Sequence, residues 1–181
     1  MSLPATDAAS PIPEGEPEPA QPPFNARDFR DALGCFPTGV TVVTAAVPDG
    51  RRAGLTVNSF SSVSLNPPLV LWSLFLHSPS MPIFQEATHY CINVLSANQV
   101  DLARHFAKHW DDKFAGIDWH PGLGGAPLLK GAVAQFQCRN SDRHYGGDHV
   151  IFLGAVERYT YGSGEPLLFT RGAYRTFSSL D

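Results

Sequence analysis

The chain has 181 residues, enough for one domain with a sizeable hydrophobic core. It carries 13 Lys and Arg against 17 Asp and Glu, and four of these acids lie in the first 23 residues, so the rest of the chain is formally neutral. A neutral body lacks the clustered basic side chains that nucleic acids and anionic membrane surfaces attract, so we expect neither partner. The longest apolar run, residues 69–76, is too short to span a bilayer.

Residues 1–23 differ in composition from everything that follows. They contain seven prolines and no Lys or Arg. Such a segment buries too little apolar surface to offset the entropy lost on ordering, so we expect a disordered tail here and a folded domain at residues 24–181. The segment also lacks the basic and apolar regions of a signal peptide.

Three cysteines, Cys35, Cys91 and Cys138, are widely spaced and form no C-x-x-C pair. Their odd number and their apolar neighbours favour buried free thiols over disulfides or a metal site. Free thiols are typical of a reducing compartment, so we expect a cytoplasmic protein.

The first half of the chain predicts one helix followed by a series of strands. Asn25 can cap a short helix that runs to Leu33, with Phe29 and Leu33 as its apolar face. The sequence P-D-G at residues 48–50 is typical of a tight turn. Strands are predicted for residues 39–47, for residues 53–64 as one strand or two, and for residues 69–74. Residues 69–74 are apolar on both faces, so we expect this strand to lie in the centre of a sheet.

The second half adds two helices between further strands. One helix begins near residues 78–82, and the capping-box pattern of Ser96 and Gln99 starts an amphipathic helix that includes Phe106. Residues 110–131 predict a long loop. Strands are predicted for residues 90–95, 132–140, 149–159, 166–170 and 173–177. Because strands come in runs with only occasional helices, the pattern favours an antiparallel barrel with helical insertions over a doubly wound sheet.

Residues 54–68 (G-L-T-V-N-S-F-S-S-V-S-L-N-P-P) concentrate hydroxyl and amide side chains in one short window. Thr56, Asn58, Ser59, Ser61 and Ser62 can offer hydrogen bonds to a ring edge or to a phosphate without adding a charge. By itself, the segment also fits a Ser/Thr-rich hairpin that binds no ligand.

Two further segments, residues 36–44 (F-P-T-G-V-T-V-V-T) and residues 147–152 (G-D-H-V-I-F), complete the pattern. In this order the three segments resemble the flavin reductase family, the NAD(P)H:flavin oxidoreductases that serve two-component monooxygenases. The resemblance covers residues 25–177. It implies a mainly β fold with helical insertions, an antiparallel split β-barrel of the FMN-binding type. It also implies FMN or FAD, NADH or NADPH as co-substrate, a homodimer, and a transient oxygenase component as partner.

The resemblance further implies roles for individual residues. Asp148 and His149 would bind the nicotinamide, and a motif near the flavin is similar to residues 112–114 (D-K-F), although Lys113 fits an ordinary surface lysine equally well. Flavin contacts are implied at Pro37, Thr38, Thr56, Val57, Asn58, Ser59, Ser61, Ser62, Ser73, Ser78, Ser80 and Phe114. Since the cofactor carries the hydride chemistry, we expect no acid or base catalyst and no metal.

The loop that holds Ser78 and Ser80 departs from the family pattern. The two serines precede a helix, whose free N–H groups can hold a phosphate. Many relatives have an Arg or Lys in this loop, whereas His77 and Pro79 stand here. Phosphate binding at this position would therefore rest on neutral hydrogen bonds.

Other functions fit the sequence less well. A non-catalytic flavin- or haem-binding split-barrel protein would use the same strands but would need no nicotinamide site at His149. An oxidase of a pyridoxamine-type substrate would need a cluster of Arg and Lys for the substrate phosphate, and the sequence shows no such cluster. The G-L-G at residues 122–124 lacks the flanking strand and helix of a Rossmann turn. His105 and His109 have metal-ligand spacing, but without an H-E-x-x-H glutamate a surface or interface pair is favoured.

Overall fold

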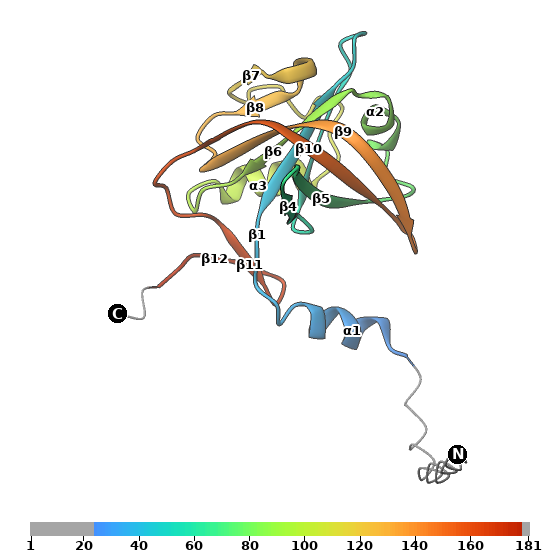
Figure 1. Cartoon of the computed structure of the whole chain (residues 1–181). Coiled ribbons are helices and arrows are strands. Elements are labelled where there is room, and N and C mark those ends of the chain that lie inside the picture. The colour runs from blue at the N-terminus through green and yellow to red at the C-terminus, as the bar shows by residue number, and fades with distance from the viewer. Residues whose placement is uncertain (1–23, 179–181) are drawn as a thin grey trace, which may run out of the picture.

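A seven-stranded antiparallel sheet forms the body of the protein (Figure 1), whose computed structural model describes residues 24–178. The predicted tail at residues 1–23 lies outside the described residues. The strand order is β3-β2-β6-β9-β10-β5-β4, and every neighbouring pair is antiparallel, as the sequence predicts. These strands are Arg52–Val57 (β3), Thr41–Ala46 (β2), His89–Val94 (β6), Ala134–Gly146 (β9), His149–Tyr161 (β10), Pro68–Phe75 (β5) and Ser61–Leu65 (β4).

An aromatic cluster fills the core beneath β5 and β10. Trp72, Phe84, Tyr90 and Phe152 are fully buried. The rings of Trp72 and Phe152 stack with centroids 4.8 Å apart, and Phe84 meets Trp72 edge-on at 4.9 Å. Phe84 belongs to α2 (Met81–Glu86), so the cluster fixes this helix against the sheet. Burial of each ring contributes on the order of 2 kcal/mol to the stability of the fold. The cluster thereby holds in place the ends of β5 and β10, next to the β5–α2 loop and the β9–β10 turn.

The predicted strand at residues 69–74 is β5, and it lies inside the sheet between β10 and β4. Its burial alternates along the strand: Val70, Trp72 and Leu74 are buried, whereas the residues between them are half-buried. The prediction was a central strand, and β5 is not an edge strand of the sheet. Its second face carries Leu71 and Ser73 at partial exposure.

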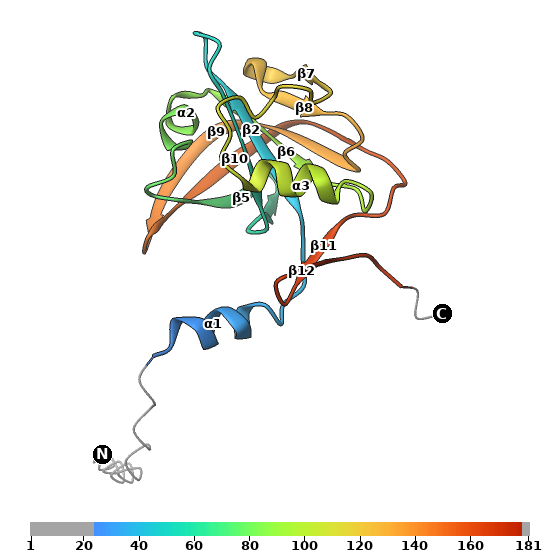
Figure 2. The same cartoon turned by 180° about the vertical axis from the view of Figure 1, so that it is seen from behind.

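Helix α1 (Ala26–Leu33) stands away from the rest of the molecule (Figures 1 and 2). As predicted, Asn25 caps it: the side-chain Oδ1 accepts from the backbone N–H groups of Arg27 at 2.9 Å and Asp28 at 3.2 Å. Its predicted apolar face, however, is not covered by the described chain, since Phe29 is 50% and Leu33 58% exposed.

Helix α3 (Val100–Ala107) covers the free edge of the sheet at β3. The hydroxyl of Thr56 on β3 donates to the Ala103 carbonyl of the helix at 2.6 Å. Only half of the predicted capping box forms, because Gln99 Oε1 accepts from Ser96 N, whereas the Ser96 hydroxyl bonds Asn98 instead. An edge strand exposes unpaired backbone groups, and here a helix covers them.

The predicted loop at residues 110–131 contains regular structure that its sequence did not reveal. Short strands β7 (Trp119–Pro121) and β8 (Pro127–Leu129) flank a 3-10 turn, η1 (Leu123–Gly125), formed by the glycine run. The buried Asn93 of β6 holds this hairpin to the sheet, because its side chain accepts from Leu129 N at 2.9 Å and donates to the carbonyl of Pro127 at 3.4 Å. A third, small sheet joins β1 (Thr38–Gly39), β11 (Leu168–Thr170) and β12 (Ala173–Arg175).

All three cysteines are free. Cys91 and Cys138 are buried as predicted, but the prediction is wrong for Cys35, which is exposed because it follows the detached helix α1. Within residues 24–178, no helix is long and apolar enough to cross a membrane.

Candidate functional site

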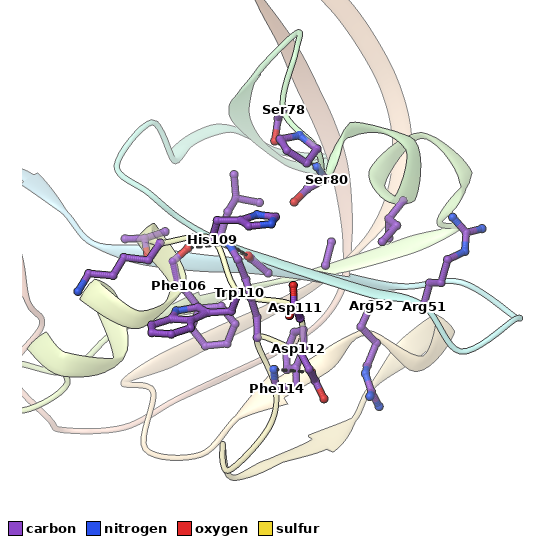
Figure 3. Close-up of a pocket in the computed structure, with 18 of the residues that line it drawn as sticks. Arg51, Arg52, Ser78, Ser80, Phe106, His109, Trp110, Asp111, Asp112 and Phe114 are labelled. Carbon is purple, nitrogen blue, oxygen red and sulfur yellow. Dashed lines mark hydrogen bonds between the residues drawn. The ribbon is translucent and has the colours of Figure 1, made fainter.

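A cavity of about 630 Å³ lies beside β3, between the β5–α2 loop and the segment that follows α3. Its walls include four of the residues singled out from the sequence, Thr56, Ser78, Ser80 and Phe114. In Figure 3, Ser78 and Ser80 lie on one side of this hollow, and His109, Trp110 and Asp111 face them from the other. We call this the first cavity.

The β5–α2 loop presents neutral groups to the first cavity. Ser80 occupies the N-cap position of α2 without capping it, and the Ser78 hydroxyl accepts from Ser80 N at 3.3 Å. The two nearby arginines, Arg51 and Arg52, already contact other side chains. Arg51 bridges Asp49 at 2.6 Å and Glu86 at 2.8 Å, and the Arg52 guanidinium lies 5.0 Å above the Trp119 ring. Phosphate binding through neutral hydrogen bonds at this loop stays a prediction.

The segment after α3 is held in place by its own contacts. The His105 ring stacks on Trp110 at 5.5 Å and its Nε2 lies 2.8 Å from the Lys113 carbonyl, so His105 serves the local structure. The Asp112 carboxylate accepts from Phe114 N at 2.9 Å. Lys113 is half-buried, and desolvation lowers the pKa of its ammonium. Its Nζ donates to the carbonyls of Gly54 and Phe106, each at 3.0 Å.

A second cavity, of about 800 Å³, lies between the end of α1 and the β11–β12 turn. Thr38 and Asn58 line it, and both come from the motifs that suggested a flavin site. The Thr38 hydroxyl oxygen is buried without a hydrogen-bond partner among the described residues, which is unusual for a polar atom. The turn itself is fastened to α1, since Arg171 N and the Thr170 hydroxyl both donate to the Gly34 carbonyl.

A smaller third cavity adjoins both of the others. It shares Thr56 and Ala107 with the first cavity, and Asn58 and Phe169 with the second, and Val57 contributes to its wall. The end of β3 therefore forms a common wall of three adjoining cavities, which we call the trough. Seven residues predicted as flavin contacts line it: Thr38, Thr56, Val57, Asn58, Ser78, Ser80 and Phe114.

Other predicted contacts lie outside the three cavities. The Ser59 hydroxyl accepts from Ser73 N at 3.0 Å, so these two predicted contacts bond to each other across the gap between β3 and β5. Ser61 and Ser62 are exposed on β4, and the Ser61 hydroxyl donates to the Ser62 carbonyl. Pro37 is exposed just before β1.

Asp148 and His149 form the β9–β10 turn and the start of β10. Gly147 has φ +63°, the left-handed conformation that a glycine adopts without strain, and this allows the tight turn. His149 Nδ1 lies 2.6 Å from Asp148 Oδ1, and this hydrogen bond lowers the pKa of the Asp148 carboxyl. Leu76 N donates to the Asp148 carbonyl at 2.9 Å, and the His149 ring meets Phe75 edge-on. The turn thus adjoins the start of the β5–α2 loop, which leads to Ser78.

The sequence matches the family described as "Flavin reductase like domain" over residues 33–178. The chain belongs to this family. The resemblance seen in the three sequence segments is confirmed, and so is the antiparallel split-barrel fold. The chain is similar to the FMN reductase (NADH) SmoA of Agrobacterium fabrum, with 49% identity over 85% of this chain and 87% of that protein. It is also 42% identical to a probable flavin reductase of Rhizobium meliloti, but spans only 49% of that protein's length.

Solved flavin reductases have the same fold. The NADH:FAD oxidoreductase SgcE6 of Streptomyces globisporus, in complex with NAD and FAD fragments, superposes with a TM-score of 0.81 at 40% identity, over 87% of this chain and 98% of that one. The nitrilotriacetate monooxygenase component B homologue of Mycobacterium thermoresistibile has a TM-score of 0.80 at 37% identity, over 84% of this chain and 86% of that one. Membership of the family establishes the class of the chain, an oxidoreductase of flavins and nicotinamide nucleotides. The residue roles remain predictions.

Sequence reasoning missed two features of the site. It left the role of Lys113 open, and it gave no sign that the β11–β12 turn closes the second cavity through Phe169 and Gly172. The D-K-F motif contained the signal for the first feature, but backbone carbonyl acceptors have no sequence signature. Thr170 of the turn lies 136 residues from Gly34 at the end of α1, and only the fold brings the two together.

Proposed function

We propose that the protein uses NADH or NADPH to reduce FMN or FAD bound along the trough, and releases reduced flavin to a separate monooxygenase component. The observation that carries this proposal is that three cavities adjoin along the end of β3. Thr38 of β1, Thr56 of β3 and Asn58 just after β3 belong to the family motifs, and each lines at least one of these cavities. Cavities of this size are typical of cofactor sites.

The chemistry of the walls fits a flavin that binds reversibly. Redox chemistry is supplied by the flavin itself, which accepts a hydride from the dihydronicotinamide. The chain contributes neutral donors: the Thr38 hydroxyl, the Asn58 amide and the serines of the β5–α2 loop. Neutral hydrogen bonds contribute about 0.5–1.5 kcal/mol each, so a few of them orient a ring and still allow its release. Phe114, 6% exposed at the base of the first cavity, helps to exclude water.

The nicotinamide is assigned to Asp148 and His149. The pair stands on a rigid turn whose hydrogen bond to Leu76 fixes it beside the β5–α2 loop. The Asp148 carboxylate holds the His149 ring in one orientation through the 2.6 Å contact at Nδ1 and leaves Nε2 free for a ligand. In this arrangement His149 positions the dihydronicotinamide and transfers no proton.

The protein is inferred to act as a homodimer in the cytoplasm. Exposed apolar side chains on α1 and β4, namely Phe29, Leu33, Val63 and Leu65, support the dimer, since Leu65 is 94% exposed. Such side chains are typically covered by a partner. The three free cysteines are consistent with a reducing compartment. An oxygenase partner is suggested by relatives such as the flavin-dependent monooxygenase reductase subunit HsaB of Mycobacterium tuberculosis, which is 41% identical over 83% of this chain.

A direct assay tests the proposal. Purified protein is mixed with FMN, FAD or riboflavin, and the loss of NADH or NADPH absorbance is followed under anaerobic conditions together with the bleaching of the flavin. Turnover that depends on both substrates supports the assignment. Flavin binding without NAD(P)H oxidation would instead indicate a non-catalytic flavin-binding protein.

A further inference from the structure

Lys113 makes contacts unlike those of an ordinary surface lysine. Its Nζ lies 3.0 Å from the Gly54 carbonyl and 3.0 Å from the Phe106 carbonyl. No carboxylate forms an ion pair with it among residues 24–178. The neighbouring acid, Asp112, is bonded to Phe114 N. The ammonium is therefore held by two backbone oxygens alone.

Both acceptor carbonyls lie where their own strand or helix provides no backbone N–H as a partner. Gly54 lies on β3, the edge strand of the seven-stranded sheet, and Phe106 lies in the last turn of α3. Carbonyls in the last turn of a helix have no partner within the helix, and they carry the negative end of its dipole. One cation thus joins the edge strand, the helix end and the segment at residues 108–114, which are three walls of the first cavity.

The junction depends on very close packing at Gly54. A Cβ at this position would lie 2.6 Å from Phe106 Cε1 and 3.0 Å from Phe114 Cζ. Helix α3 and Phe114 can approach the strand this closely only because Gly54 has no side chain. Gly54 comes two residues before Thr56 and four before Asn58, so movement of the strand here would displace the predicted flavin contacts.

We propose that Lys113 is a positioning residue for flavin binding: by bonding the Gly54 and Phe106 carbonyls it holds the segment at residues 108–114 against β3 and keeps the first cavity in its binding shape. This inference rests on the proposed function, because it takes the first cavity as part of the flavin site. Lys113 acts through the cavity wall rather than on the nicotinamide. Its loss lowers the population of the binding-competent shape, and the apparent dissociation constant rises in inverse proportion to that population.

The test compares Lys113→Met with Lys130→Met as a matched control. Methionine keeps an apolar stem and removes the charge and all donors. Lys130 is exposed and pairs with Asp118 beside the β7–β8 hairpin, away from the three cavities. Flavin affinity is measured from the quenching of FMN fluorescence without NADH. Amide hydrogen exchange then reports on residues 52–57 and 108–114 in both variants.

We expect Lys113→Met to raise the dissociation constant and the KM for FMN on the order of tenfold, with faster exchange confined to the two segments. The KM for NADH, and kcat at saturating FMN, should match those of the parent and of Lys130→Met. An unchanged FMN affinity in a variant whose two segments exchange faster would overturn the proposal and leave Lys113 a purely structural residue. If the parent bound FMN but did not oxidise NADH, the proposed function would fail, whereas the binding measurement would still decide the role of Lys113.

Discussion

Gly54 is the position at which a single methyl group should disturb both the packing and the flavin site. Alanine at this position places a Cβ 2.6 and 2.8 Å from two carbons of the Phe106 ring and 3.0 Å from Phe114 Cζ. Neither ring can move outward freely, since Phe106 is fully buried and Phe114 is 6% exposed, and the two rings meet edge-on at 5.3 Å. The strand, the helix or both must therefore shift.

Overpacking of a well-packed site by one methyl group costs about 1–3 kcal/mol. The lower backbone entropy of alanine in the unfolded chain offsets about 0.4–1 kcal/mol of this. We expect a net destabilisation of about 1–2 kcal/mol, which for a domain of this size lowers the melting temperature by about 2–8 °C. The KM for flavin should rise at the same time, because Phe114 and the Lys113 contact lie at the displaced junction.

Urea titration and thermal melts measure the stability of Gly54→Ala, and steady-state reduction of FMN measures its KM. Gly162→Ala is the matched control, because a Cβ at Gly162 meets no atom within 4 Å. The reasoning is refuted if Gly54→Ala is as stable as Gly162→Ala, since the calculated contacts would then have no energetic consequence.

Four further predictions concern other parts of the site and the core. Asn58→Ala should raise the flavin dissociation constant several-fold with an unchanged melt, as expected for the loss of a neutral hydrogen bond worth about 0.5–1.5 kcal/mol; an unchanged constant would place the flavin elsewhere. His149→Ala should raise the KM for NADH or slow hydride transfer in stopped-flow reduction without changing flavin affinity, and parent-like kinetics would exclude a nicotinamide role. Burial raises the pKa of Cys138 to about 12 and that of Cys91 well above its ordinary value of 9.0, so a thiol reagent should modify only Cys35 in the native protein. Because the unfolded chain releases these two thiol protons first, the free energy of unfolding should fall as the pH rises above 9, by on the order of 1 kcal/mol per thiol at pH 10, and a flat profile in urea titrations would contradict the linkage.

Local rules predicted those elements whose determinants lie close together in the chain. The Asn25 cap, the turn at residues 48–50 and the strands of β2, β5 and β6 follow from capping, turn chemistry and β-branched composition. The β7–β8 hairpin was missed, because its stability comes from Asn93, about 35 residues earlier in the sequence. A buried amide that holds a distant loop by backbone hydrogen bonds leaves no periodic pattern in either segment.

In the site, too, features set by neighbouring residues could be predicted, whereas features set by distant residues could not. Thr56, Asn58, Ser78 and Ser80 were predicted as flavin contacts because a flavin needs neutral donors and because the family motifs mark their positions, and the structure places all four in cavity walls. Exposure of the α1 face was not foreseen, since Phe29 and Leu33 follow the spacing of a helix that packs on its own domain. Spacing identifies an apolar face, but it does not say whether the covering surface belongs to the same chain.

Lys113 shows most clearly how a charged residue can escape sequence analysis. Most lysines are solvated, whereas the ammonium of Lys113 has backbone carbonyls as its acceptors and pairs with no carboxylate of residues 24–178. Such acceptors become available only where an edge strand and a helix end meet, and that meeting requires a glycine at position 54. Lys113, Gly54, Phe106 and Phe114 thus form one structural unit, although Gly54 lies 59 residues before Lys113 in the sequence. If this unit sets the shape of the flavin cavity, then the double variant Gly54→Ala, Lys113→Met should raise the KM for FMN by less than the product of the two single effects, because the first change already loosens the contact that the second removes.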